Sequence, residues 1–200
     1  MRKTNLYAAG VVSAVAVAAG AGIATAPVAA QSSTLRARAE IVGEGISGVA
    51  EFREIASESA GATDPRYPVG TIAVEISVRV KGLTAGAHGV HVHEIGACEP
   101  AFTAAGGHFD PGPHGMSDPD ANHPFHMGDL PNLIVNTGGE GGFTVRTTRV
   151  TLSPGPTSIL DQDGTAIIIH GNPDQGITGE PKSGVSGGPR VACGVVRKIG

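Results

Sequence analysis

Residues 71–83, TIAVEISVRVKGL, alternate apolar and polar side chains almost without a break. Successive side chains of a strand point to opposite faces, so this period of two predicts a β-strand with one face in a core. Seven further runs rich in β-branched residues and bounded by Gly, Pro or Asp predict strands over 35–42, 47–55, 88–95, 132–136, 143–152, 166–170 and 190–199. No segment shows a helical period, and the sequence therefore predicts an all-β sandwich or barrel of eight strands.

The composition agrees with a β-rich globular fold. Of 200 residues, 31 are Gly and 14 are Pro, whereas 5 are Phe, 2 are Tyr and none is Trp. The core must therefore be built mainly from Val and Ile, while the Gly content favours turns and long loops. Fourteen basic residues against 18 acidic ones give a formal net charge of −4, which argues against a nucleic-acid partner.

The beginning of the chain has the pattern of a cleaved export signal. Arg2 and Lys3 precede an apolar, Ala-rich run over about 6–28, and the small residues Val28-Ala29-Ala30 favour cleavage after Ala30. An uncleaved membrane anchor is the alternative, because the run is long enough to span a bilayer. The Gly, Pro, Ser and Thr residues within the run favour cleavage.

Residues 1–30 are therefore expected to be a signal peptide and residues 31–200 a single domain. The mature protein is expected to be exported to the periplasm, the cell envelope or the extracellular space, with no stable membrane anchor after cleavage. Cleavage removes Arg2 and Lys3 but no acid, so the net charge becomes 12 − 18 = −6.

The two cysteines are Cys98 and Cys193. Outside the cytosol such a pair is expected to form a disulfide, and two buried free thiols are the alternative. The bridge would close a span of 193 − 98 = 95 residues. On the loop-entropy model it would stabilise the fold by about 4–5 kcal/mol.

Two long segments, 96–130 and 171–189, are dense in Gly, Pro, Asp and Asn and predict loops, which at this length are usually functional. His91 and His93 lie within a predicted strand, whose period places both imidazoles on one face, about 6–7 Å apart. Further candidate ligands lie in the first loop and at the end of another strand: His108, His114, His123, His126, Asp129 and His170. Nitrogen donors with one carboxylate and no thiolate favour Zn²⁺ or Cu²⁺.

Four motifs resemble those of the copper/zinc superoxide dismutases. Residues 86–94, GAHGVHVHE, resemble the family's copper-strand signature. Residues 105–111, AGGHFDP, and 126–130, HMGDL, resemble its zinc-loop motifs, and residues 188–195, GPRVACGV, resemble its C-terminal signature. The motifs occur in the family's order, and the resemblance extends from about residue 36 to residue 199.

The resemblance implies an eight-stranded Greek-key β-barrel or sandwich, immunoglobulin-like, with two long functional loops. It also implies an oxidoreductase that converts superoxide to dioxygen and hydrogen peroxide at a copper centre bridged to a structural zinc. One copper and one zinc per subunit, antioxidant defence outside the cytosol, and a monomer or homodimer follow from the same resemblance. The alternative is an exported copper/zinc-binding module or metal carrier without dismutase activity.

The resemblance also assigns the metal ligands. Copper would be held by His91, His93, His108 and His170. Zinc would be held by His108, His114, His126 and Asp129. His108 would then bridge the two metals, and His123 is an alternative to His114.

Three more residues receive roles in this way. Asp174 would link the two sets of ligands by hydrogen bonds to their imidazoles. Arg190 would attract and dock the anionic substrate, and His108 would also pass a proton to the product. His88 precedes the copper pair and is expected to be a packed, structural histidine.

Overall fold

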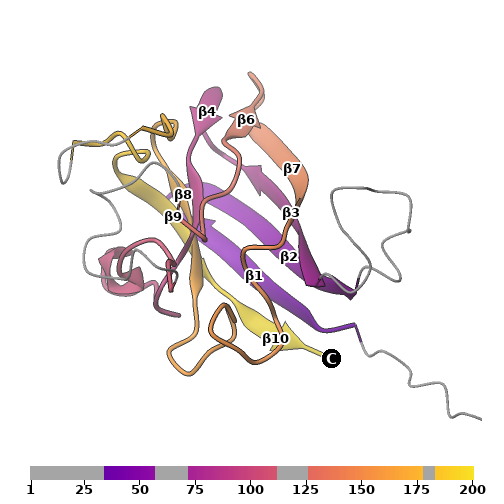
Figure 1. The fold of residues 1–200 in the computed structure, drawn as a ribbon. Helices are drawn as coiled ribbons and strands as arrows, with labels where there is room; N and C mark the ends of the chain where they lie inside the picture. The colour runs from indigo at the N-terminus through magenta and orange to yellow at the C-terminus, as the bar shows by residue number, and fades with distance from the viewer. Residues whose placement is uncertain (1–33, 57–71, 112–125, 178–182) are drawn as a thin grey trace, which may run out of the picture. The chain divides into compact units, whose positions relative to one another are not determined.

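The computed structural model describes residues 34–56, 72–111, 126–177 and 183–200. In these ranges the chain forms one antiparallel sheet of ten strands and a short 3₁₀ helix, η1 (Figure 1). The strands are β1 Arg36–Gly43, β2 Ile46–Ala56, β3 Ile72–Lys81, β4 Gly86–His88, β5 Val90–His93, β6 Leu133–Val135, β7 Glu140–Thr147, β8 Ala166–His170, β9 Arg190–Val195 and β10 Arg197–Ile199; η1 is Thr103–Ala105. No helix among the described residues is long and apolar enough to cross a membrane.

The all-β prediction is confirmed, and ten strands replace eight because two runs are divided. The 88–95 run becomes β4 and β5, which are separated by Gly89, whose N–H donates to the carbonyl of Asn172 (2.8 Å). The 190–199 run becomes β9 and β10, separated by Val196, whose N–H donates to Thr165 (2.9 Å).

The strand expected over 143–152 begins earlier, at Glu140, and ends at Thr147. The Gly-rich run 137–142, TGGEGG, lies between two predicted strands and by its sequence predicts a hairpin loop throughout. Gly141 and Gly142 instead pair with Val80 and Arg79 of β3, and the turn is confined to the residues before Glu140.

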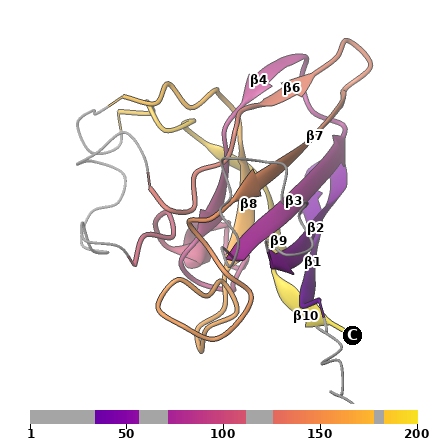
Figure 2. The same ribbon diagram turned by 45° about the vertical axis from the view of Figure 1, so that its right-hand side comes forward.

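The order of strands in the sheet explains why it curls. The path is β4-β6-β7-β3-β2-β1-β9-β8-β5, and β10 pairs with the start of β1. Its two end strands, β4 and β5, are consecutive in the chain with Gly89 alone between them, so the sheet must bend round into a nearly closed barrel. The connections β3–β4 and β7–β8 join strands that are not hydrogen-bonded neighbours, as in a Greek key (Figures 1 and 2).

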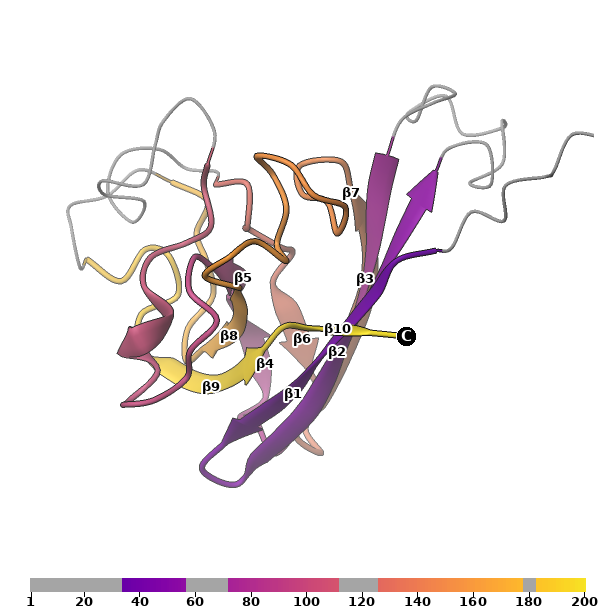
Figure 3. The ribbon, with the colours of Figure 1, turned by 90° about the horizontal axis from the view of Figure 1, so that it is seen from below.

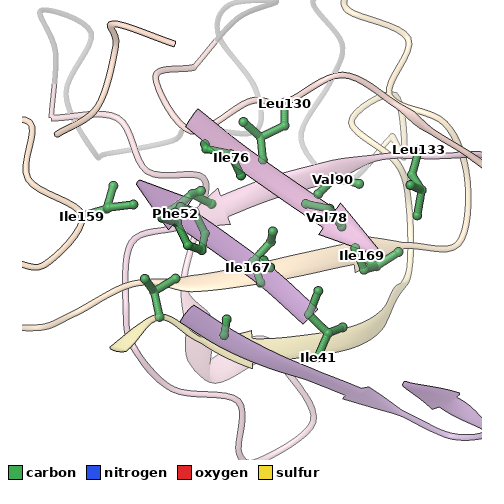
Figure 4. Packing of buried hydrophobic residues seen from close by; sticks show 14 of the residues in the cluster. Ile41, Phe52, Ile76, Val78, Val90, Leu130, Leu133, Ile159, Ile167 and Ile169 are labelled. Carbon is green, nitrogen blue, oxygen red and sulfur yellow. The ribbon is translucent and has the colours of Figure 1, made fainter. Parts of the chain in front are cut away.

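The barrel interior is filled by alternate side chains of its strands. Ala37, Ala39 and Ile41 of β1 are buried, and so are alternate residues of β3 from Val74 to Val80. Figure 4 shows Phe52 among Val, Ile and Leu side chains, in line with the scarcity of aromatic residues. Seen from below, β1, β2 and β3 lie on one side of the barrel and β5, β8 and β9 on the other (Figure 3).

One wall of the barrel is buried on both faces. All five residues of β8 are buried. Ile167 and Ile169 belong to the interior core, whereas Ala166 and Ile168 pack outward with Ala105 and Cys193 in a second cluster. The 94–111 segment supplies Ala105 and therefore covers the outer face of this wall, where the candidate site lies.

Candidate metal centre

Strand β5 presents two histidines to the covered outer face. Val90 and Val92 point into the core, and alternation therefore turns His91 and His93 outward. The two imidazoles are fully buried, and their ring centroids are 6.2 Å apart. This separation matches the spacing that the sequence predicts.

Two more histidines complete a four-histidine group: His91, His93, His108 and His170. His170 is the last residue of β8, which pairs with β5. The backbone of His108 pairs with that of His93 in an isolated antiparallel β-bridge. The ring of His91 lies 3.9 Å from that of His108 and 4.7 Å from that of His170, measured between centroids. One ring nitrogen from each of the four lies within 4.8 Å of the others, so a single ion can contact all four.

Two nitrogens of this group have the environment that a metal ligand needs. His91 Nδ1 and His93 Nε2 are buried and have no hydrogen-bond partner. The opposite nitrogen of each ring is bonded, because His91 Nε2 lies 2.8 Å from Asp174 Oδ2 and His93 Nδ1 lies 3.0 Å from the Gly106 carbonyl. These bonds hold the proton on the outer nitrogen and leave the inner lone pair for a metal. An unsatisfied buried polar atom costs about 1–3 kcal/mol, so this geometry fits metal binding.

The protonation of these two rings favours the same role. Burial lowers the pKa of His91 and of His93 well below the usual histidine value, and the neighbouring His108 lowers both further. Both imidazoles are therefore neutral near pH 7, and the neutral form is the one that binds metals.

A second set, the aspartate group, consists of His108, His126 and Asp129. His108 Nδ1 lies 2.8 Å from Asp129 Oδ1 and 3.2 Å from His126 Nδ1. Burial raises the pKa of Asp129, but hydrogen bonds with His108 and His126 outweigh it and hold that pKa below its ordinary value. Two imidazoles and an ionised carboxylate suit zinc, and His108 belongs to both groups.

The remaining histidines divide into two kinds. His114 and His123, the alternative zinc ligands, lie outside the described residues. His88 belongs to neither group: its Nδ1 is 2.8 Å from the carbonyl oxygen of His170, and its Nε2 is 2.9 Å from that of Thr84. His88 thus fastens the β3–β4 connection to the end of β8.

Arg190 opens β9 beside the four-histidine group. Its Nη1 donates to the Phe102 carbonyl (2.9 Å) and its Nη2 to the Gly106 carbonyl (2.6 Å). A pocket of about 480 Å³ is lined by Arg190, His108, His170, Thr103 and residues 183–186, 188 and 189. A small anion in this pocket would meet the guanidinium and two of the four histidines.

The expected disulfide is confirmed. Cys98 and Cys193 are joined, with 95 residues between them in sequence and 5.8 Å between their Cα atoms. The bond ties the covering segment to β9, three residues from Arg190. It therefore helps to hold the carbonyls that orient the Arg190 guanidinium.

The sequence does not predict three groups that hold residues of the candidate site in place. The Gly106 carbonyl bonds both His93 and Arg190, but a main-chain group has no sequence signature. Its residue carries one indirect sign: Gly106 has φ +72° and ψ −152°, a backbone conformation that essentially only Gly adopts. Asn132 exchanges two hydrogen bonds with the backbone of Asp174, and Arg149 donates to the Asp129 carbonyl; no local pattern marks either.

The comparisons with known proteins agree on one family. The model of the copper/zinc superoxide dismutase family matches residues 46–196. A superoxide dismutase [Cu-Zn] of Deinococcus radiodurans is 38% identical over 149 residues, which cover 69% of this chain and 76% of that protein. Another, from Caulobacter vibrioides, is 36% identical over 147 residues, covering 70% of this chain and 79% of that protein.

Solved structures give the same result. The crystal structure of a double mutant of a SOD-like protein from Bacillus subtilis has a TM-score of 0.58 and 32% identity. It covers 79% of this chain and 95% of that chain.

Fold and site together define a β-barrel protein with two adjoining histidine-rich groups, each able to hold a metal ion, on the outside of its wall. The chain belongs to the copper/zinc superoxide dismutase family. It is an oxidoreductase that converts superoxide to dioxygen and hydrogen peroxide, with copper and zinc as its metals.

Proposed function

We propose that the four-histidine group holds copper and that the aspartate group, completed by His114, holds zinc. The observation that carries this assignment is the pair of buried nitrogens, His91 Nδ1 and His93 Nε2, that face the group without a partner. The carboxylate of the aspartate group favours zinc on that side. His108 turns Nδ1 toward the aspartate group. Its Nε2 is therefore left to contact an ion in the four-histidine group.

Bound copper supplies one-electron chemistry, by which one superoxide is oxidised to dioxygen and another is reduced to hydrogen peroxide. The chain's own residues prepare the site for it. Asp174 and the Gly106 carbonyl orient the rings of His91 and His93, and the covering segment excludes water from both rings. His108 is proposed to pass a proton to the product from Nε2 at the stage of the reaction when this nitrogen does not bind copper.

Arg190 is proposed to dock the substrate. Its guanidinium cannot lose its charge near neutral pH, and two backbone carbonyls hold it at the pocket. Because both the chain and superoxide are negative, a local positive group is needed to draw the anion in. Such steering raises association rates by about 10–10³-fold, a range known in part from this enzyme family.

Metal analysis of matched variants tests the assignment. The purified protein is expected to contain one copper and one zinc per chain, His93→Gln to lose copper but keep zinc, and His126→Gln to lose zinc first. His114→Gln is expected to lose zinc while His123→Gln keeps it. The opposite result for the last pair would make His123 the ligand, and equal loss of both metals from His93→Gln and His126→Gln would contradict the separate assignment.

Activity is measured as suppression of superoxide-driven cytochrome c reduction, with its loss in cyanide. Arg190→Ala is expected to lower the rate and its dependence on ionic strength, whereas copper content stays unchanged. A protein that binds zinc alone and is inactive would instead fit the alternative of an exported binding module without dismutase activity.

Residues 1–30, which lie outside the described residues, are proposed to be the signal peptide of an exported domain, 31–200. The Cys98–Cys193 disulfide supports an oxidising compartment: periplasm, cell envelope or exterior. The mature protein is proposed to be unanchored and to be a monomer or a homodimer. N-terminal sequencing of the active protein is expected to begin at Gln31, and sedimentation of that protein gives its subunit number; an intact Met1 on the active protein would contradict cleavage.

A further inference from the structure

Arg149 lies two residues beyond β7, on the connection that leads to β8, and its side chain reaches back to the aspartate group. Its Nη2 donates to the backbone carbonyl of Asp129. Its Nε and its own backbone N–H both donate to the buried hydroxyl of Thr147, at 3.4 and 3.2 Å. One side chain therefore joins the end of β7 to the middle of the candidate zinc site.

The position of the Asp129 main chain decides where its carboxylate points. The carboxylate is engaged on both oxygens, by His108 Nδ1 (2.8 Å) and by the backbone N–H of His126 (2.7 Å). On one side the main chain is held by β5, because the next residue, Leu130, donates to the Val90 carbonyl (3.1 Å). Arg149 holds it on the other side.

We propose that Arg149 is a positioning residue for zinc, acting through the main chain of Asp129 without touching the metal. The inference rests on the assignment of Asp129 as a zinc ligand. Partners behind a metal ligand typically change affinity by about 10–100-fold, and the loss of Arg149 falls in this class.

The contact needs an arginine for a geometric reason. The guanidinium places Nε on the Thr147 hydroxyl and Nη2 on the Asp129 carbonyl at the same time, along two directions of one rigid plane. A lysine ammonium is a single point on a flexible stem and reaches one acceptor at a time. Arg149→Lys is therefore expected to retain part of the effect.

The surroundings of Arg149 provide a matched control and a rescue. Arg149 and Arg146 line one pocket of about 460 Å³ together with Asp129. Arg146 carries the same charge, but its Nε donates to Glu75 (2.9 Å), on the outer face of the sheet. Because the pocket is large, a small guanidinium ion added to the solution can occupy the place that a truncated Arg149 leaves.

The test measures metal affinity on copper-free protein, with Zn²⁺ in competition with a chelator and Co²⁺ as a spectroscopic probe of the same site. Arg149→Ala is expected to bind both ions about 10–100-fold more weakly and to show an altered Co²⁺ absorption spectrum. Methylguanidinium is expected to restore much of the affinity. Arg146→Ala is expected to bind zinc like the parent, and copper binding is expected to change little in either variant.

Equal zinc affinity in Arg149→Ala and the parent, or equal weakening by Arg149→Ala and Arg146→Ala, would overturn the proposal. Arg149→Gln, which keeps an amide donor and much of the volume, is measured alongside in case the alanine variant folds poorly. Asp129→Asn distinguishes a failure of the zinc-ligand assignment from a failure of the positioning role of Arg149. If it leaves zinc affinity unchanged, the ligand assignment fails; if it abolishes binding while Arg149→Ala has no effect, the positioning role alone fails.

Discussion

The two faces of the β5–β8 wall are both buried, but by different means. On the inner face Val90, Val92, Ile167 and Ile169 pack into the core, and burial of apolar surface is itself stabilising. On the outer face His91, His93 and His170 are as deeply buried, and their ring nitrogens need partners. The inner face is held by packing, whereas the outer face is buried under the 94–111 segment and, on the proposed assignment, is stabilised further by metal.

The 94–111 segment, the cover of the outer face, is held in place by contacts with residues far away in the sequence. The Cys98–Cys193 bond fastens it to β9, and Arg190 holds the carbonyls of Phe102 and Gly106. The inner face needs no such disulfide or side-chain hydrogen bonds, because its apolar side chains pack directly into the core. Changes to the outer face should therefore alter metal binding as well as stability, and changes to the inner face should alter stability alone.

Removal of the disulfide is expected to have the largest effect. Cys98→Ser should lower the free energy of unfolding by about 4–5 kcal/mol on the loop-entropy model, and it should loosen the cover. Zinc occupancy should fall as well. The measurements are chemical unfolding and metal content after dialysis, and unchanged metal content would show that the cover does not depend on this bond.

Two neighbouring isoleucines of β8 give the most direct comparison of the faces. Ile167 points inward, and Ile168 packs outward against Cys193 and Ala105. Each change to alanine should cost about 2–5 kcal/mol, because both side chains are fully buried. Ile168→Ala should also weaken metal binding, whereas Ile167→Ala should destabilise the metal-free and metal-loaded protein equally. Identical metal dependence in the two variants would remove the distinction between the faces.

A smaller effect is expected from Asp174→Asn. Asp174 Oδ2 holds the outer nitrogen of His91, so the substitution should weaken copper binding by about 10–100-fold. Asp163→Asn, a change of the same kind at an exposed side chain, is the control. Copper affinity is measured by competition, and a similar loss in both variants would argue against the ring-orienting role.

The smallest change is expected at Ala101, in the cover. Ala101 has φ +56°, a conformation that is unfavourable for residues with a Cβ. Ala101→Gly should raise the free energy of unfolding by about 0.5–1 kcal/mol and leave metal binding unchanged. Ala104→Gly, within η1, should instead destabilise by a similar amount. Thermal unfolding measures both, and a loss of stability in the first would show that the cover already accommodates the strain.

The sequence predicted the strands well because each is a run that either alternates apolar and polar residues or is rich in β-branched residues, bounded by Gly, Pro or Asp. Its error lay in the Gly-rich run 137–142, where Gly141 and Gly142 pair within the sheet against neighbours that local sequence does not reveal. For the site, four motifs pointed to the histidines, to Asp129 and to Arg190. They did not reveal Arg149, which contacts Asp129 from 20 residues further along the chain.

By itself, the sequence determined the all-β class, the core composition, the spacing of His91 and His93, and the pairing of the two cysteines. These are properties of local period and residue chemistry. The tertiary structure decided which face of β5 became a site, because that face is buried only when the 94–111 segment folds over it. It also placed His108 in both histidine-rich groups and the carbonyl of Gly106 within hydrogen-bonding distance of both His93 and Arg190, since these contacts arise only when distant segments pack together.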